Sequence, residues 1–150
     1  MSLLKNLDRP ESILEKGEML GFEYRITHNF GGARCGYIKV PPGHPWHGMD
    51  FEIIPCEVHG GLTFSSGESE GSEWWIGFDF AHPSDLRDPD LPFESSIFRD
   101  EILGFYNRIQ ELCNRGSKPH LWTQDEVRAE CMRVAGQAKG AVKDSLTAPD

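Results

Sequence analysis

The sequence lacks two features that would point to membranes or nucleic acids. It has no uninterrupted apolar run of roughly 18 residues, the length that marks a membrane-spanning helix. It has no run of basic residues either, and its 15 Lys and Arg against 24 Asp and Glu give a formal net charge of −9. Because such an acidic surface repels phosphate backbones, we expect neither a nucleic acid nor a membrane as partner.

Cysteine is scarce and shows no metal-binding spacing. The four cysteines include no C-x-x-C pair, which argues against a structural zinc site of the usual kind. The opening "MSLLKNLDRPE" has no apolar core typical of a secretory signal. We therefore expect reduced thiols and a cytoplasmic protein.

The chain is long enough for one domain over residues 1–150, with 38% hydrophobic and 11% aromatic residues. Pro10 and Gly17 suit the first position and the end of a short helix at about 9–16. A sheet is expected over about 19–82, because residues 22–28 alternate apolar and polar and Gly31-Gly32 suits a turn to a second strand. Two further strands, 57–65 and 74–82, are joined by a polar loop around 66–73 that we expect to be mobile.

Helical spacing dominates the rest, over about 96–115 and 124–142. Apolar residues recur every three or four positions in both segments, and Thr123 and Glu126 have the form of a capping box. Strands followed by helices predict an α+β fold, in which an antiparallel sheet of about four or more strands carries two C-terminal helices packed on one face. The expected packing residues are Phe98, Phe105, Ile109, Val127 and Val134.

The last two strands contain the most informative residues. If they pair with all their apolar residues on one face, Phe64 lies opposite Trp74, and His59 opposite Asp79. The same register places Gly61 opposite Gly77 and Thr63 opposite Trp75, and the nearest alternative moves Asp79 opposite Gly61.

Two glycines facing each other would leave a bare trough beside an imidazole–carboxylate pair, where a ligand could approach. The alternative is structural: a ring, with Trp46 as the candidate, fills the space and the His–Asp pair is a hydrogen bond of the fold. The predicted ligand-binding residues are His59, Gly60, Gly61, Thr63, Trp75, Gly77 and Asp79.

A metal site is the second hypothesis. His82 ends the last expected strand and Asp85 lies in the loop after it. With His59 and Asp79 they supply the nitrogen and oxygen ligands that zinc or a similar divalent ion accepts. A regular strand would place Asp79 and His82 on opposite faces, so this site needs a bulge.

Other titratable residues are weaker candidates, and the pattern identifies no catalytic residue. Cys35 has the chemistry of a nucleophile but no supporting motif. His44 and His47 are expected to be solvated, and Cys113 and Cys131 to be buried.

Four segments carry a resemblance: "GYIKVPPGHPWHG", "VHGGLTF", "WWIGFDFAHPSD" and "AECMRVAGQ". Together they resemble a family of small uncharacterised proteins of bacteriophages and bacterial mobile elements, over roughly residues 34–140. Its pattern is H-G-G-x-T-[FY], a loop, then W-[WF]-x-G-F-D-x-x-H-x-G-D, from which this chain departs at Pro83 and Ser84. The family has no established activity, so the resemblance implies a bacterial host and a set of matched residues. These are His59, Gly60, Gly61, Thr63, Trp75, Gly77, Asp79, His82 and Asp85.

Three functions follow as hypotheses. The first is binding of a small polar or nucleotide-like ligand, or of a host protein. The second is a metal-assisted hydrolase that uses His59, Asp79, His82 and Asp85. The third is a purely structural or protein-binding role for the acidic surface and the helix pair. The sequence does not fix the oligomeric state.

Overall fold

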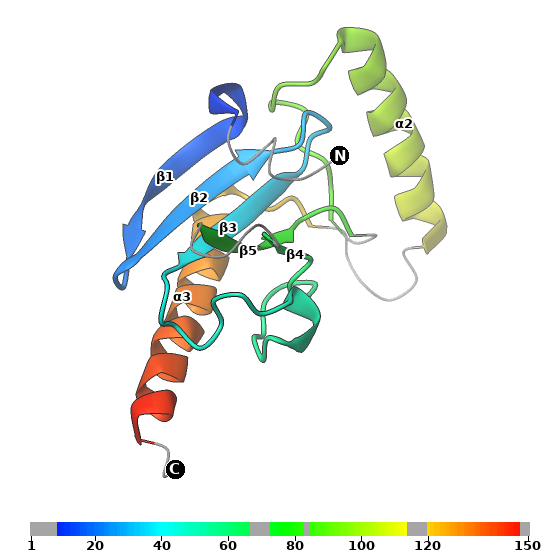
Figure 1. Ribbon diagram of the computed structural model, residues 1–150. Coiled ribbons are helices and arrows are strands. Elements are labelled where there is room, and N and C mark those ends of the chain that lie inside the picture. Colours follow the sequence, from blue (N-terminus) through cyan, green and yellow to red (C-terminus); the bar gives the residue numbers. More distant parts are fainter. Residues whose placement is uncertain (1–8, 67–72, 83–84, 114–119, 148–150) are drawn as a thin grey trace.

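A five-stranded antiparallel sheet forms the centre of the protein (Figure 1). The computed structural model describes residues 9–66, 73–82, 85–113 and 120–147. The strand order is β1-β2-β3-β5-β4, and the α+β class is therefore confirmed. Within the described ranges, neither helix is long and apolar enough to cross a membrane. The elements are β1 (Ile13–Met19), β2 (Phe22–His28), β3 (Arg34–Val40), β4 (Phe64–Ser65), β5 (Trp74–Asp79), α2 (Ser96–Cys113) and α3 (Gln124–Thr147), with short 3-10 turns at Pro10–Ser12 and Phe51–Ile53.

Helix α3 covers one face of the sheet, as its apolar spacing predicts. The side chains of its stripe are fully buried and join those of β2, β3 and β5 in the main core. Thr123 and Glu126 form the predicted capping box: each side chain accepts a hydrogen bond from the other residue's backbone N–H, at 3.0 and 3.2 Å. The helix therefore begins at a position that its own sequence specifies. The stripe consists of Val127, Cys131, Val134 and Ala138.

Helix α2 does not cover the sheet, and this part of the expected packing is wrong. Figure 1 shows it standing to one side of the strands. Phe105 is 59% exposed and Ile97 is 71% exposed. The apolar spacing predicted that a helix forms there, but it could not show whether the sheet face was already taken by α3. The side chains of Ile109, Leu112 and Cys113, residues 114–115 and most of the 66–73 loop lie outside the described part.

Replacing Phe105 with alanine should therefore change the free energy of unfolding by no more than about 0.5 kcal/mol, as at other exposed positions. Phe78, which is 2% exposed in the main core, is the matched control. Phe78→Ala should show the full cost of deleting a buried ring. Denaturant unfolding of both variants checks this, and a large loss at Phe105 would mean that α2 packs elsewhere.

Residues 9–16 are not a helix, so that prediction is wrong. Pro10 begins a single 3-10 turn, and β1 follows directly as an edge strand paired with β2. Gly17 lies within β1 opposite Tyr24, whose ring covers it. The hairpin turn is made by Leu20 and Gly21, both with positive φ, the geometry of a tight two-residue connection. Hairpin pairing with the next strand, β2, thus overrides the helix signals.

The register between β4 and β5 also differs from the expected one. Phe64 pairs with Gly77, three residues away from the predicted partner Trp74. This odd shift turns Phe64 to the opposite sheet face from α3, where it meets Tyr37 and Trp75. The cause is Gly60 and Gly61, whose positive φ angles make a turn in place of the expected strand from 57.

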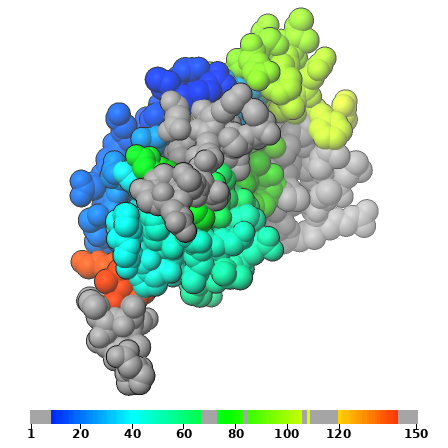
Figure 2. All heavy atoms as spheres, in the orientation of Figure 1, coloured from blue at the N-terminus to red at the C-terminus, as the bar shows by residue number. Residues whose placement is uncertain are grey.

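The segment between β3 and β4 forms a large part of the front surface in Figure 2. It is anchored by His44, which is 7% exposed, so the expectation of a solvated side chain is wrong. His44 Nε2 donates to the Ala138 carbonyl at 2.8 Å, and Nδ1 accepts from the Trp46 N–H at 2.9 Å. His47 is partly buried, with Nδ1 2.8 Å from the Val40 carbonyl.

Burial lowers the pKa of His44, and it also lowers the pKa of the fully buried His28. The unfolded chain therefore takes up protons first as the pH falls below the usual histidine value of about 6.5. The stability that these rings contribute should be present above that pH and lost as the pH falls through the folded-state pKa values. Denaturant unfolding at pH 7.5 and pH 5.5 tests this. The loss should be smaller in His44→Gln, and an equal loss would contradict the assignment.

Candidate functional site

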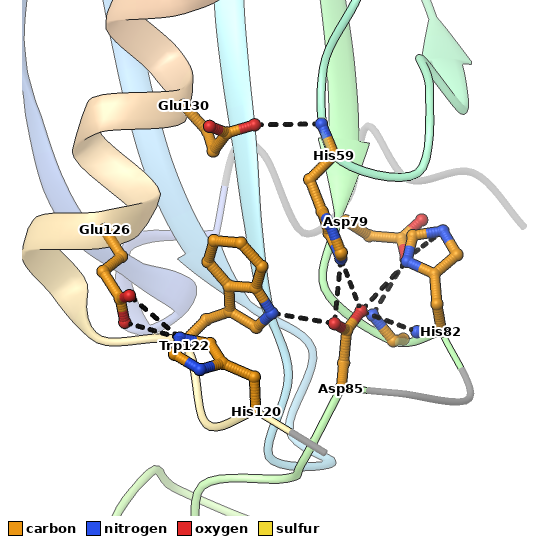
Figure 3. A network of polar contacts seen from close by, with 9 residues as sticks. His59, Asp79, His82, Asp85, His120, Trp122, Glu126 and Glu130 are labelled. Carbon is orange, nitrogen blue, oxygen red and sulfur yellow. Dashed lines mark hydrogen bonds and ion pairs between the residues drawn. The ribbon is translucent and has the colours of Figure 1, made fainter. Parts of the chain in front are cut away.

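The candidate site is built around the carboxylate of Asp85, which is fully buried (Figure 3). Oδ1 accepts from His59 Nε2 and from Trp122 Nε1, both at 2.8 Å. Oδ2 accepts from the backbone N–H of His82 at 2.9 Å and lies 3.0 Å from His82 Nδ1. Three separate segments of the chain thus meet at one carboxylate group.

Both the side chain and the backbone of His59 are held by neighbouring residues. Its ring stacks on Phe80 with centroids 5.1 Å apart and contacts Trp122 at 4.4 Å. Its backbone N–H donates to Glu130 Oε1 of α3 at 2.9 Å. A quarter of the side chain stays exposed, so the ring is fixed in orientation but still accessible.

Gly60 is required because the ring of His82 lies against its backbone. A Cβ at this position would collide with the imidazole, and φ is +71°. Gly61 has φ +78° with open space beside it, and its N–H donates to the Val58 carbonyl at 2.8 Å. The two glycines therefore form the turn that brings His59 and His82 together, with ring centroids 5.3 Å apart.

Asp79 lies on the other side of His82, at the end of β5. Its Oδ1 is 3.8 Å from His82 Nε2 and accepts from the Ala81 N–H at 3.1 Å, while Oδ2 accepts from Thr63 Oγ1 at 3.0 Å. Because β5 ends at Asp79, the chain turns before His82, and the two side chains approach each other without the expected bulge.

The predicted pairing of His59 with Asp79 is wrong. The imidazole of His59 contacts Asp85, and the carboxylate of Asp79 contacts Thr63. The error follows from the register between β4 and β5, since Phe64 and not Gly61 lies opposite Gly77, and from the turn at Gly60 and Gly61 that takes His59 out of the strand.

The predicted trough is also absent. Gly77 is covered by Tyr37: a Cβ on the glycine would lie 2.5 Å from Cδ1 of that ring. The structural alternative therefore applies at Gly77, but with Tyr37 in place of Trp46, which lies in the main core. Trp75 is 2% exposed and offers no stacking surface. Its ring carries the guanidinium of Arg25 at 4.7 Å.

Cys35 and Cys131 do not take part in this site. Burial, together with the nearby Asp79 carboxylate, raises the pKa of the Cys35 thiol to about 12, which removes it as a nucleophile near neutral pH. Cys131 of α3 is fully buried in the main core, as expected, and burial raises the pKa of its thiol to about 12.

His59, His82 and Asp85 form a group of side chains that could hold a metal ion. One candidate ligand atom from each lies within 4.8 Å of the others. Ligands of a tetrahedral zinc ion, at about 2.0–2.1 Å from the metal, are about 3.3 Å apart. The widest pair would therefore have to close when a metal binds, and the contacts of Asp85 with His59 at 2.8 Å and with His82 Nδ1 at 3.0 Å would have to open.

Sequence reasoning missed two residues that complete this site, Trp122 and Glu130. Trp122 lies just before the capping box of α3, and its indole N–H fixes one oxygen of Asp85. Glu130 lies one turn further along the helix and fixes the backbone of His59. No local pattern around either residue points to this role, because both contacts join segments far apart in the sequence.

Comparison with known proteins adds no assignment: no family model, no curated protein and no solved structure matches this chain. The fold and the site therefore define it only by class, as an α+β protein with an antiparallel sheet and a histidine–aspartate cluster at the end of β5.

Proposed function

We propose that this protein binds a divalent transition-metal ion through His59, His82 and Asp85. The observation that carries the proposal is the convergence of two imidazoles and one carboxylate within 4.8 Å. Imidazole nitrogens favour zinc and its transition-metal neighbours, whereas magnesium and calcium prefer oxygen ligands alone.

The surroundings of the carboxylate support the same proposal. Ligating carboxylates are themselves commonly hydrogen-bonded by neighbouring groups, and Trp122 Nε1 supplies such a bond to Asp85. The stack of His59 on Phe80 limits the rotation of one imidazole, and the contact of His82 with Gly60 limits the other. Ligand groups that are already oriented lose less entropy when a metal binds.

Metal-assisted hydrolysis is the activity we propose for this centre. Three protein ligands leave a fourth position of a tetrahedral ion for water, as in catalytic zinc sites. The metal would lower the pKa of that water and supply hydroxide near neutral pH. His59 and His82 are a quarter to a third exposed, so a substrate can reach this position.

The first test is metal binding by the purified protein. After treatment with a chelator, the chain should take up one equivalent of zinc, measured by competition with a chromophoric chelator. His59→Gln should weaken binding at least 100-fold, since a ligand is lost. His120→Gln is the matched control, because its imidazole pairs with Glu126 outside the cluster. A parent protein without zinc affinity would show that the cluster is a structural hydrogen-bond network.

The second test is catalysis. The zinc-loaded protein should hydrolyse at least one activated ester of a panel that includes p-nitrophenyl acetate and bis-p-nitrophenyl phosphate. His59→Gln should lose that activity. Zinc binding without any turnover would support a metal-binding function and contradict the proposed hydrolase activity.

Binding of a host protein is a second candidate, favoured by the exposed apolar side chains of Ile97 and Phe105 on α2. The bacterial host of this candidate follows from the phage-family resemblance, and its cytoplasmic location from the expectation drawn from the sequence. The double variant Ile97→Ser, Phe105→Ser should keep the parent's melting temperature but no longer retain a partner from host extract. Retention by the variant would remove this candidate.

A further inference from the structure

The carboxylate of Asp79 has a defined orientation toward His82. One oxygen accepts from the Ala81 N–H and the other from the Thr63 hydroxyl, at 3.1 and 3.0 Å. These two contacts leave Oδ1 3.8 Å from Nε2 of His82, on the side of the ring away from Asp85 (Figure 3). The imidazole therefore lies between two carboxylates, with Nδ1 facing Asp85 and Nε2 facing Asp79.

This placement decides which nitrogen of His82 can serve as a ligand. Nδ1 lies 3.0 Å from Asp85 Oδ2, on the side where the other candidate ligands converge. A neutral imidazole that binds a metal through Nδ1 carries its proton on Nε2. In the metal-free protein the 3.0 Å contact with the Asp85 carboxylate requires the proton on Nδ1, and a metal that binds there displaces it. The Asp79 carboxylate, 3.8 Å from Nε2, then favours the proton on Nε2 and raises the basicity of the ligating nitrogen.

We infer that Asp79 is a positioning residue, which stabilises the Nε2–H form of His82 once a metal has replaced the proton on Nδ1, and that Thr63 in turn orients Asp79. This inference rests on the proposed metal site and corrects the sequence-based expectation, in which Asp79 was itself a ligand. It also gives a role to Thr63, whose hydroxyl donates to the carboxylate.

Zinc affinity of Asp79→Asn gives the first test. The amide can keep the contact with the Ala81 N–H, so the metal-free variant should fold and melt close to the parent. Its zinc affinity should fall about 10–100-fold, the usual cost of removing a group that orients a ligand. Thr63→Val should shift the affinity in the same direction by a smaller factor.

Asp50→Asn is the matched control. Asp50 makes the same type of contact with the backbone two residues ahead, at 2.9 Å to the Glu52 N–H, but is exposed and is not part of the cluster. Its zinc affinity should equal that of the parent.

The tautomer itself can be measured by long-range ¹H–¹⁵N NMR of the zinc-loaded parent. His82 should ligate through Nδ1 and carry a slowly exchanging proton on Nε2, and this proton should exchange faster in Asp79→Asn. A parent that binds zinc through Nε2 of His82 would overturn the inference, as would an Asp79→Asn variant with parental affinity. Either result would contradict the role of Asp79 but not the proposed metal site. A parent protein that binds no zinc would instead contradict the proposed function itself. If Asp79→Asn does not fold, the NMR measurement on the parent and the zinc affinity of Thr63→Val still test whether Asp79 positions His82.

Discussion

Replacing Asp85 with asparagine is expected to abolish zinc binding and to lower the free energy of unfolding of the metal-free protein by about 2–5 kcal/mol. The carboxylate is fully buried and accepts from His59, His82 and Trp122. An amide presents an NH₂ group to at least one pair of these donors, and each buried donor left without an acceptor costs about 1–3 kcal/mol. The variant also loses the only charged ligand of the proposed site.

Both effects can be measured in one denaturant experiment. Zinc at 100 times its dissociation constant should stabilise the parent by about 2.7 kcal/mol and the Asp85→Asn variant not at all. Asp88→Asn is the matched control, because Asp88 is a mostly buried carboxylate that pairs with Arg34 at 3.0 Å, away from the imidazoles. This control should lose stability and keep the full zinc response. An Asp85→Asn protein that zinc still stabilises would contradict the ligand assignment.

Replacing Gly77 with valine is expected to destabilise the protein by about 3 kcal/mol, at the upper end of the usual range for an overpacked core. Gly77 lies opposite Tyr37 on one side and Phe64 on the other, and these two rings meet edge to face over it at 5.6 Å. A Cβ at Gly77 would lie 2.5 Å from the Tyr37 ring and 3.1 Å from the Gly36 carbonyl oxygen. Valine suits a strand intrinsically, so the loss would come from the displaced ring.

Gly136→Val in α3 provides the comparison. Nothing lies within 4 Å of the position where its Cβ would be, so its effect should be small. Melting temperature and zinc affinity should be measured together for Gly77→Val. A stable Gly77→Val protein with altered zinc affinity would mean that the residue belongs to the site after all.

Much of the local structure could be predicted from the sequence. The alternation in β2, the apolar stripe of α3 and its capping box are all set by residues within a few positions of one another. The same holds for the turn after β2, where Gly32 has a positive φ. These features form because local spacing determines which side chains share a face.

The errors fall where pairing or packing with another segment decides the structure. Pro10 and Gly17 suited a helix, but pairing with β2 made that segment a strand. The apolar spacing of α2 suited a buried helix, but α3 occupies the sheet face and Phe105 remains exposed. In each case the residues favour the predicted element locally, but the pairing or packing of the whole fold favours another arrangement.

The sequence by itself determined the fold class and the identity of the side chains that could form a site. His59, His82 and Asp85 were all among its candidates, because a few titratable residues near strand ends are visible without a structure. Only the tertiary structure decided which of them meet. Two glycines with positive φ turn the chain before β4, shift its register by three residues and bring His59 to Asp85 in place of Asp79. Backbone conformations of this kind depend on the whole core that surrounds them, and a periodic reading of the sequence assumes a regular strand at that point.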